Sequence, residues 1–417
     1  MGKITEYETA SLTTIIFFAL VMSALPNVAN ATANTLQITV APGYFIQEAI
    51  NRAQVGATIH IQKGIYIEEN YPIIANKTVT LIGENVDASI IDGNRTEHSI
   101  FLVKSDGVKI KSLTIRNTVE IGFEVAAVHL ANVKNVEVTD CKLGECIVGV
   151  LLKNASNSII ARNKITNNRV EGILMRDNCA SNLIFGNIIS NNINGVRTTD
   201  FTCTGNKIYH NNFVNNTYQT MLMGIGGMWD NGYPSGGNYW SCYEGVDYYS
   251  GPYKNVTGSD GVGDAPYGDG LDRYPFMGLI QFFNAGRWDE NDYHVIVASN
   301  AIISDFDFNP NVGCFVKFNV TVPNEKTGFC RVMIPCQLLW IGSGEQWTVT
   351  ANGEAVNSLT IDDSELDNTY FYFICTQGIQ TIKISGTHAI PELSIVSILV
   401  TMALLLTVVI LTKRVCA

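Results

Sequence analysis

Apolar residues recur at a fixed spacing along the middle of the chain. Three consecutive segments, beginning at Gly149, Gly172 and Gly195, align with one another at intervals of 23 residues. Each contains three short apolar stretches separated by turns that carry Asn or Gly. One unit cannot bury its apolar face alone, whereas stacked units bury a continuous core and pair each strand with its counterpart in the next unit. The pattern predicts an all-β chain whose body, residues 34–278, is a right-handed parallel β-helix.

Three apolar columns define the register of this repeat. They contain Val150, Ile173 and Val196; Val138, Ile160, Ile184 and Ile208; and Leu143, Ile165, Ile189 and Phe213. Asn167, Asn191 and Asn215 fall at equivalent corners, where Asn tolerates left-handed backbone angles and can bond to the same amide one rung away. We expect an asparagine ladder there. A leucine-rich repeat is the alternative fold, but no segment shows the helical period that it requires.

Residues 279–389 change to longer alternating strands separated by turns at hairpin spacing. This pattern predicts a small antiparallel β-sandwich. We expect it to hold the β-helix away from a membrane; binding through its loops is the alternative role.

Both ends of the chain carry apolar segments. Residues 1–33 are typical of a secretory signal peptide, with Ala29-Asn30-Ala31 as the cleavage pattern; an uncleaved anchor is the alternative. Residues 393–412 carry no charge and are long enough to cross a membrane, and Lys413 follows at once. Residues 390–417 are therefore predicted to be a transmembrane anchor with a short cytoplasmic tail. The chain is expected to be a single-pass cell-surface protein, with its bulk outside the cytoplasm.

Charge and composition narrow the choice of partners. Only 16% of residues are charged, and the formal net charge is −11. No basic cluster stands out, so we expect no nucleic-acid partner. Six sequons fit a glycosylated exterior: Asn76, Asn94, Asn154, Asn215, Asn255 and Asn319.

Two segments resemble known β-helix proteins. They are FIQEAINRAQVGATIHIQKGIYIEE, near the start of the repeats, and WDNGYPSGGNYWSCYEGVDYYSGP, near their end. The first resembles the N-terminal cap of carbohydrate-associated β-helices, with a short helix near residues 44–53. The repeats resemble the NosD-type, or PbH1-repeat, family, and the second segment resembles the ending of archaeal-type surface proteins in that group, except that Cys242 stands where relatives carry Asp. The resemblance, over residues 38–278, implies a protein of the carbohydrate-binding and sugar-hydrolase β-helix group; copper belongs to a few members only.

The cysteines lie mostly in the part predicted to be exported, where disulfides persist. Cys179 and Cys203 occupy the same turn position on neighbouring rungs, within bridging distance, so we predict a disulfide between them. Cys141 and Cys146 could close one corner. The four cysteines after residue 300 in the predicted sandwich allow three pairings that the sequence does not separate.

Four acidic residues lie in a glycine-rich loop near the end of the repeats: Asp260, Asp264, Asp269 and Asp272. Carboxylate oxygens on such a loop are the ligands that Ca²⁺ prefers, which predicts a structural calcium site. The alternative is a cluster of turns that closes the coil. Copper is not expected, because the chain has no His-x-His or Met-rich tract.

A second acidic pair comes from the repeat register. Asp177 and Asp200 are 23 residues apart and should be neighbours, beside Arg176 and Arg197. Like charges raise one pKa or attract a cation, so the four residues could form an acid–base site for glycosidic or lyase chemistry. The alternative is that they are turn residues.

Aromatic residues crowd the end of the repeats and suggest a sugar-binding surface. Trp229, Tyr239, Trp240 and Tyr243 are the candidates, since planar rings stack on sugar faces; the same rings could instead cap the coil. No dense catalytic motif is present. The leading hypothesis is a non-enzymatic module that binds a polysaccharide or cell-envelope glycan, and the alternatives are a lyase or glycosidase and a copper accessory protein.

Overall fold

The protein is all-β apart from one short helix. The computed structural model describes residues 36–119, 124–224, 227–289, 291–324, 327–362 and 365–390. Within these residues no helix is long and apolar enough to cross a membrane. The predicted signal peptide (1–33) and the predicted membrane segment (393–412) lie outside the described residues.

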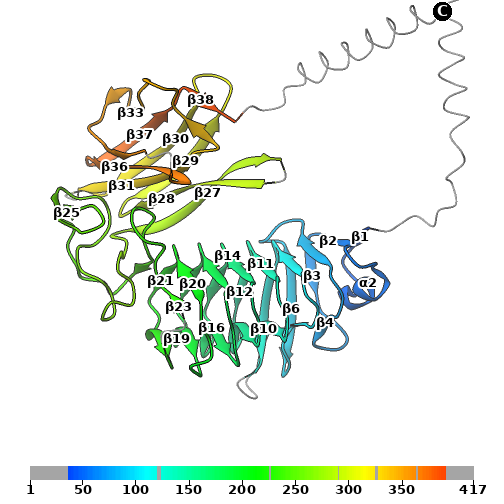
Figure 1. Cartoon of the computed structure of the whole chain (residues 1–417). Coiled ribbons are helices and arrows are strands. Elements are labelled where there is room, and N and C mark those ends of the chain that lie inside the picture. The colour runs from blue at the N-terminus through cyan, green and yellow to red at the C-terminus, as the bar shows by residue number, and fades with distance from the viewer. Residues whose placement is uncertain are drawn as a thin grey trace, which may run out of the picture.

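Three parallel sheets form the first part of the chain, and successive strands pass from one sheet to the next (Figure 1). The nine-stranded sheet contains β1 (Gln37–Val40), β2 (Thr58–Ile61), β5 (Thr80–Gly83), β8 (Lys109–Lys111), β11 (Glu137–Thr139), β14 (Ile159–Ala161), β17 (Leu183–Phe185), β20 (Asn206–Tyr209) and β23 (Gly227–Met228). The eight-stranded sheet contains β3 (Gly64–Tyr66), β6 (Ser89–Thr96), β9 (Thr114–Thr118), β12 (Lys142–Gly144), β15 (Lys164–Thr166), β18 (Ile188–Ser190), β21 (Asn212–Val214) and β24 (Tyr239–Trp240). The seven-stranded sheet contains β4 (Ile73–Ala75), β7 (Phe101–Val103), β10 (Ala126–Ala131), β13 (Val148–Lys153), β16 (Glu171–Arg176), β19 (Asn194–Thr198) and β22 (Tyr218–Leu222).

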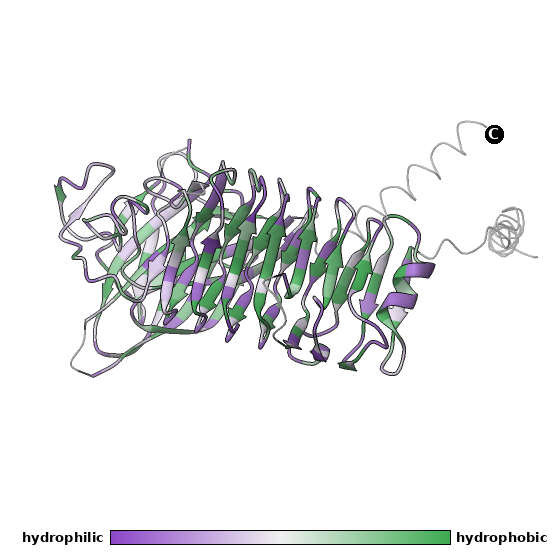
Figure 2. Cartoon of the chain, turned by 90° about the horizontal axis from the view of Figure 1, so that it is seen from below, coloured by the Kyte–Doolittle hydropathy of each residue, from purple (hydrophilic) through white to green (hydrophobic). Residues whose placement is uncertain are grey.

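The predicted register is confirmed. Val150 pairs with Ile173, which pairs with Val196, and the other two columns align in the same way. Their side chains are fully buried in one core. Figure 2 shows the same apolar positions repeating from strand to strand along the coil.

The asparagine ladder lies one residue away from its predicted position. Asn168 donates to Asn192, which donates to Asn216, at 3.1 and 2.9 Å, inside the coil. Asn167 and Asn191 instead take left-handed backbone angles at the corner, with φ of 57° and 54°. The corner therefore uses two adjacent asparagines for two different purposes. A second buried ladder joins Asn163, Asn187, Asn211 and Asn238.

Each end of the coil is covered. At the N-terminal end, α2 (Ile46–Arg52) buries Ile46 and Ile50 against the core, in agreement with the predicted cap near residues 44–53. At the C-terminal end, the ring of Trp240 stacks between Phe213 and Tyr267, with centroid distances of 4.3 and 4.1 Å. Two short strands, β25 (Tyr249–Ser250) and β26 (Val256–Thr257), lie in the loops of this cap.

Two five-stranded antiparallel sheets follow. One contains β27 (Leu279–Trp288), β28 (Asn291–Ser299), β31 (Gly328–Pro335), β36 (Asn368–Cys375) and β35 (Leu359–Ile361). The other contains β29 (Ile302–Asn309), β30 (Phe315–Val322), β37 (Gly378–Ser385), β33 (Thr348–Ala351) and β34 (Glu354–Ala355), while β32 (Leu339–Trp340) pairs with β38 (His388–Ala389). Both sheets contribute to one buried core, which contains Val297 and Phe371 from the first and Phe318 and Ile384 from the second. The antiparallel, all-β character predicted for this region is confirmed.

Buried polar contacts join the antiparallel sheets to the coil. Asn212 bonds to both backbone groups of Ile280, at 2.7 and 2.8 Å. Arg331 is 1% exposed and donates to the carbonyl oxygens of Asp260 and Pro234. Because these donors and acceptors are satisfied only when the two parts are docked, the junction is a specific contact.

Candidate functional site

The outer face of the seven-stranded sheet carries an unusual set of side chains. On β10, Val128 and Leu130 point into the coil, so His129 between them points outward. Leu151, Leu174 and Arg197 occupy the equivalent outward positions on the next three strands. A second column lies near the starts of these strands, where Val148 is followed by Glu171 and Asn194. A third column lies near their ends, where Lys153 is followed by Arg176.

A small apolar cluster lies at the base of this face, separate from the core of the coil. It contains Val125, Ala126, Ile147, Val148, Leu151 and Leu174. Polar and charged side chains adjoin it. We call the following residues the outer row: Glu124, His129, Lys153, Glu171, Arg176, Asn194 and Arg197.

Two ion-pair groups order the charges of the outer row. Glu124 Oε1 lies 2.7 Å from Lys153 Nζ and 3.0 Å from Arg176 Nη1. The hydrogen bond from Lys153 lowers the pKa of the Glu124 carboxyl. Glu171 Oε1 lies 2.9 Å from Arg197 Nη1. Burial raises the pKa of Glu171, although the hydrogen bonds from Arg197 and Asn194 act in the opposite direction.

Three buried polar atoms of the outer row have no hydrogen-bond partner among the described residues: Nε2 of His129, Nε of Arg176 and Oδ1 of Asn194. Burial lowers the pKa of His129 to about 4, so its ring is neutral at physiological pH and can either donate or accept. An unsatisfied buried polar group costs about 1–3 kcal/mol. The groups of the outer row that a ligand on this face can reach are the partly exposed charges of Glu124, Lys153, Arg176 and Arg197.

Asp177 and Asp200, the predicted acid–base pair, are neighbours, as the register predicts. The backbone N–H of Asp177 donates to Oδ2 of Asp200 at 2.8 Å. Burial alone would raise the pKa of Asp200, but hydrogen bonds from Thr202, Asp177 and Thr199 lower it instead. The pKa of Asp200 is therefore lowered, because its carboxylate accepts hydrogen bonds within a turn. Arg176 and Arg197, by contrast, lie in the outer row.

The aromatic residues mostly cap the coil. Trp229 and Trp240 are each 1% exposed, so their predicted role in stacking on a sugar is wrong. Nε1 of Trp240 donates to Asp272 at 2.8 Å inside the cap. Tyr239 and Tyr243 are partly exposed, and Tyr243 donates to the carbonyl of Ala265.

The four acidic residues of the glycine-rich loop contact different partners. Asp260 faces Arg331, Asp264 accepts from the N–H groups of Tyr248 and Tyr249, and Asp272 accepts three bonds in the cap. Asp269 is exposed, with φ of 54°. Among the described residues no group of three or more His, Cys, Asp or Glu side chains could hold a metal ion. Calcium binding by this loop stays a prediction.

Cys179 and Cys203 are free thiols in this structure, and the disulfide between them stays a prediction. Cys179 and Cys203 are nevertheless neighbours inside the coil, as the register predicts. A hydrogen bond between their side chains lowers the pKa of Cys179 and raises that of Cys203. Cys330 and Cys375 are also free thiols, 3.9 Å apart between sulfur atoms.

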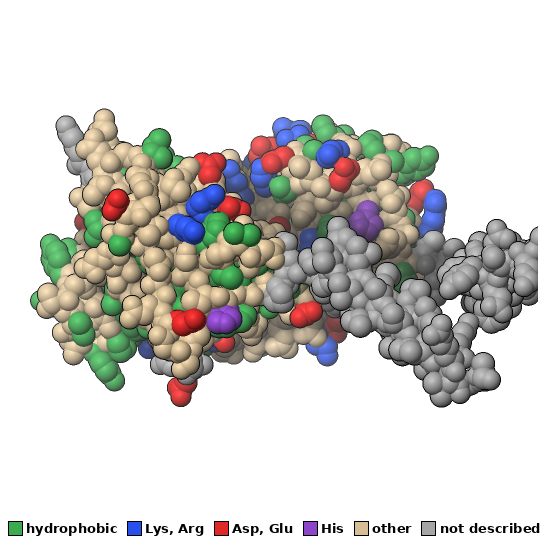
Figure 3. Space-filling model, turned by 90° about the horizontal axis from the view of Figure 1, so that it is seen from above, with side chains coloured by type: hydrophobic (Ala, Val, Ile, Leu, Met, Phe, Trp, Pro, Cys, Tyr) green, Lys and Arg blue, Asp and Glu red, His purple; other side chains and the backbone are tan. Residues whose placement is uncertain are grey.

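Sequence reasoning missed Glu171, His129 and Asn194. The repeat register could have indicated two of them, because Glu171 and Asn194 directly precede the aligned Gly172 and Gly195. On the face drawn in Figure 3, acidic, basic and hydrophobic side chains are interspersed, and no large patch of one charge is seen.

The stacked parallel strands define a right-handed parallel β-helix protein. Its β-helix is of the NosD type: the model of the family described as "Periplasmic copper-binding protein (NosD)" matches residues 50–245. No curated protein matches the chain.

Several solved β-helix structures are similar. The catalytic domain of a GH87 α-1,3-glucanase, in complex with tetrasaccharides, shares 15% identity at a TM-score of 0.35, over 50% of this chain and 39% of that one. The PL6 family alginate lyase AlyGC shares 10% identity at a TM-score of 0.37, over 49% of this chain and 32% of that one. A pectin methylesterase in complex with a hexasaccharide shares 15% identity at a TM-score of 0.26, over 40% of this chain and 66% of that one. The chain spans about a third to two fifths of the length of the glucanase and alginate lyase chains. At these identities and TM-scores, none of the three structures bears on the activity of this chain.

Proposed function

We propose that this protein is a cell-surface module that binds a glycan without cleaving it, and that the outer row is its binding surface. The observation that supports this most is the extent of the row. It crosses four successive strands, from β10 to β19, and adjacent strands lie about 4.8 Å apart, so it extends roughly 14 Å along the coil. A surface of that length suits several consecutive units of a polymer. Partly exposed charged groups lie along it, and the buried apolar cluster beside them supports their side chains.

The pairing of the carboxylates favours binding over cleavage. Glycoside hydrolysis ordinarily uses two carboxyl groups that flank the scissile bond. In the outer row Glu124 is engaged by Lys153 and Arg176, and Glu171 by Arg197. The proposed role of these groups is therefore to orient side chains that contact the glycan.

The proposal includes export and anchoring. Residues 1–33 would direct the chain out of the cytoplasm, and residues 393–412 would hold it in the membrane. The β-helix would then face the cell envelope, with the antiparallel sheets between it and the membrane.

Cleavage of the glycan is the second candidate function, and one observation favours it. Glu171 is almost fully buried, and its raised pKa would suit a proton donor, with a guanidinium beside it. On this hypothesis the catalytic acid is Glu171, in place of Asp177 or Asp200.

The test uses the full-length protein in detergent, incubated with a panel of neutral and acidic polysaccharides. Retention of the polysaccharide, reducing ends and unsaturated-uronate absorbance are measured together. We expect retention without product, weakened about tenfold in Arg176→Gln, a loss of roughly 1.4 kcal/mol. Lys164→Gln is the matched control, because Lys164 is exposed on the eight-stranded sheet.

Retention that is equal in both variants would contradict the assignment of the outer row. Product formation that disappears in Glu171→Gln would replace binding by cleavage as the function.

A further inference from the structure

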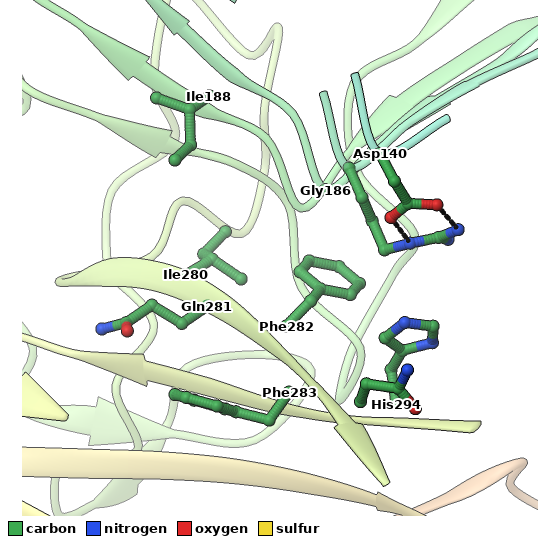
Figure 4. Close-up of a pocket in the computed structure, with 10 residues that line it drawn as sticks. Asp140, Gly186, Ile188, Ile280, Gln281, Phe282, Phe283 and His294 are labelled. Carbon is green, nitrogen blue, oxygen red and sulfur yellow. Dashed lines mark hydrogen bonds and ion pairs between the residues drawn. The ribbon is translucent and has the colours of Figure 1, made fainter. Parts of the chain in front are cut away.

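A cavity of about 400 Å³ opens where the antiparallel sheets meet the coil (Figure 4). One wall comes from the turns that follow β11, β14 and β17, through Asp140, Arg162 and Gly186. The other comes from β27 and β28, through Phe282 and His294. Neither part encloses this space alone. It lies on the turns of the nine-stranded sheet, whereas the outer row lies on the seven-stranded sheet, so the two sites are separate.

A fixed ion pair supplies hydrogen-bonding groups to the cavity. Arg162 donates to Asp140 through Nε at 2.8 Å and through Nη2 at 2.9 Å. This two-point contact sets both groups in one plane. A guanidinium has five N–H donors and a carboxylate about four acceptor positions, so the pair retains donors and acceptors side by side. Its net charge is zero.

An aromatic ring and a neutral imidazole adjoin this pair. The ring of Phe282 packs against Phe185 at 6.3 Å and edge-on to His294 at 6.4 Å between centroids. Burial lowers the pKa of His294, and the charge of Arg162 acts in the same direction, so the ring is neutral at physiological pH. In Figure 4 the side chains of Phe282 and His294 lie next to the ion pair.

The backbone at Gly186 keeps this arrangement open. Its φ is +68°, and an added Cβ would lie 3.0 Å from the Phe282 ring and 3.1 Å from the Arg162 side chain. A side chain at this position would press on both groups that line the cavity. The close approach of the turn to β27 thus depends on glycine.

We propose that this junction cleft binds one uncharged sugar unit. Adjacent hydroxyl groups of a pyranose each donate and accept, which matches the paired acceptors of Asp140 and donors of Arg162. The C–H face of the same ring suits the face of Phe282. His294 supplies one further donor or acceptor. A carboxylated sugar fits less well, because the Asp140 carboxylate already neutralises the cleft's guanidinium and would repel a second anion. The proposal rests on the cleft alone and does not require a glycan on the outer row.

The experiment titrates the full-length protein with methyl glycosides of neutral hexoses and with methyl glucuronide, and follows ligand signals by saturation-transfer NMR. We expect saturable binding of at least one neutral hexoside, with a dissociation constant on the order of 1 mM, and tenfold weaker binding of the glucuronide. Asp140→Asn should weaken binding of the neutral hexoside at least fivefold. It should also reduce the difference in affinity between the hexoside and the glucuronide, because the cleft then carries a net positive charge. Phe282→Leu, which keeps an apolar side chain but loses the ring face, should also weaken hexoside binding at least fivefold.

Asp106→Asn is the matched control, because Asp106 is an acidic turn residue that accepts from the backbone of Lys134 away from the cleft. Equal thermal unfolding temperatures of the variants confirm that they are folded. Binding that survives both cleft substitutions, or the absence of binding by any neutral hexoside, overturns the proposal. The outer-row substitution Arg176→Gln should leave hexoside binding unchanged, so that failure of one site is distinguishable from failure of the other.

Discussion

Glu171 and Arg197 form an ion pair across adjacent strands in which only one partner is hidden from water. The carboxylate side chain is 2% exposed, whereas the guanidinium side chain is 32% exposed. The pair is therefore asymmetric: Arg197 can be hydrated without its partner, but Glu171 has Arg197 as its ionic contact. A buried charge that loses its partner costs far more than a half-exposed one.

This asymmetry predicts unequal effects of the two substitutions on stability. Arg197→Met leaves an uncompensated buried carboxylate and should lower the free energy of unfolding by about 2–3 kcal/mol at pH 7. Glu171→Gln leaves a partly hydrated guanidinium and should cost about 1 kcal/mol. Urea denaturation of both variants at pH 7 measures the difference.

The same pair has a pH signature. The pKa of Glu171 is raised in the folded state, and loss of Arg197 would raise it further, so protonation relieves the Arg197→Met defect. The difference between the two variants should shrink as the pH falls towards 4.5. Equal costs at pH 7 would mean that Glu171 is not held by Arg197.

The inner asparagine ladder should contribute more to stability than the corner asparagines beside it. Asn187 accepts from both the backbone and the side chain of Asn163 and donates to Asn211 and to the carbonyl of Ile160. Asn187→Ala leaves several buried groups unpaired and should cost about 3–5 kcal/mol. Asn167→Ala changes only a corner residue at positive φ and should cost about 1–2 kcal/mol. Thermal denaturation compares the two, and similar losses would contradict the assigned ladder.

The coil could be predicted from the sequence because its signal is local and repeated. Apolar residues such as Ile160 and Ile184 recur in every unit, so the period alone gives the strand pairing. The ladder was displaced by one residue because each corner contains adjacent asparagines, and composition does not tell which one points inward.

The outer row was harder to predict because its residues differ from one repeat to the next. His129, Leu151, Leu174 and Arg197 share one column, yet nothing in their chemistry marks them as equivalent. The junction cleft could not be predicted at all, since Asp140 and Phe282 meet only when the antiparallel sheets dock on the coil.

The cap predicts that Trp240 acts on stability rather than on ligand binding. Its ring is 1% exposed and stacks between Phe213 and Tyr267. Trp240→Ala should cost about 3–5 kcal/mol. Tyr253→Ala, at an aromatic residue of the same segment that is 84% exposed, should change stability by less than about 0.5 kcal/mol. Calorimetry measures both, and a stable Trp240→Ala protein that no longer retains polysaccharide would restore the sugar-stacking hypothesis.

The buried carboxyl of Asp272 predicts a pH dependence of the cap. Burial raises its pKa to about 7, although the N–H groups of Asn238, Trp240 and Tyr274 bond to it. Because the folded-state pKa exceeds that of the unfolded chain, the contribution of Asp272 to stability is fully present below about pH 4 and is lost as the pH rises through about 7. Each pKa unit corresponds to about 1.4 kcal/mol, so the change amounts to a few kcal/mol.

Asp272→Asn isolates this effect from that of other titrating groups. The variant should be less stable than the original protein at pH 5, because an amide cannot replace both carboxyl oxygens as acceptors. The difference in free energy of unfolding between the original protein and the variant should decrease between pH 5 and pH 8. His129 and His210, whose pKa values burial lowers to about 4, act in the opposite direction over pH 4–6.5, but they are common to both proteins and cancel in the difference. Chemical denaturation at four pH values measures this difference, and a difference that stays constant or increases with pH would show that Asp272 is ionised throughout.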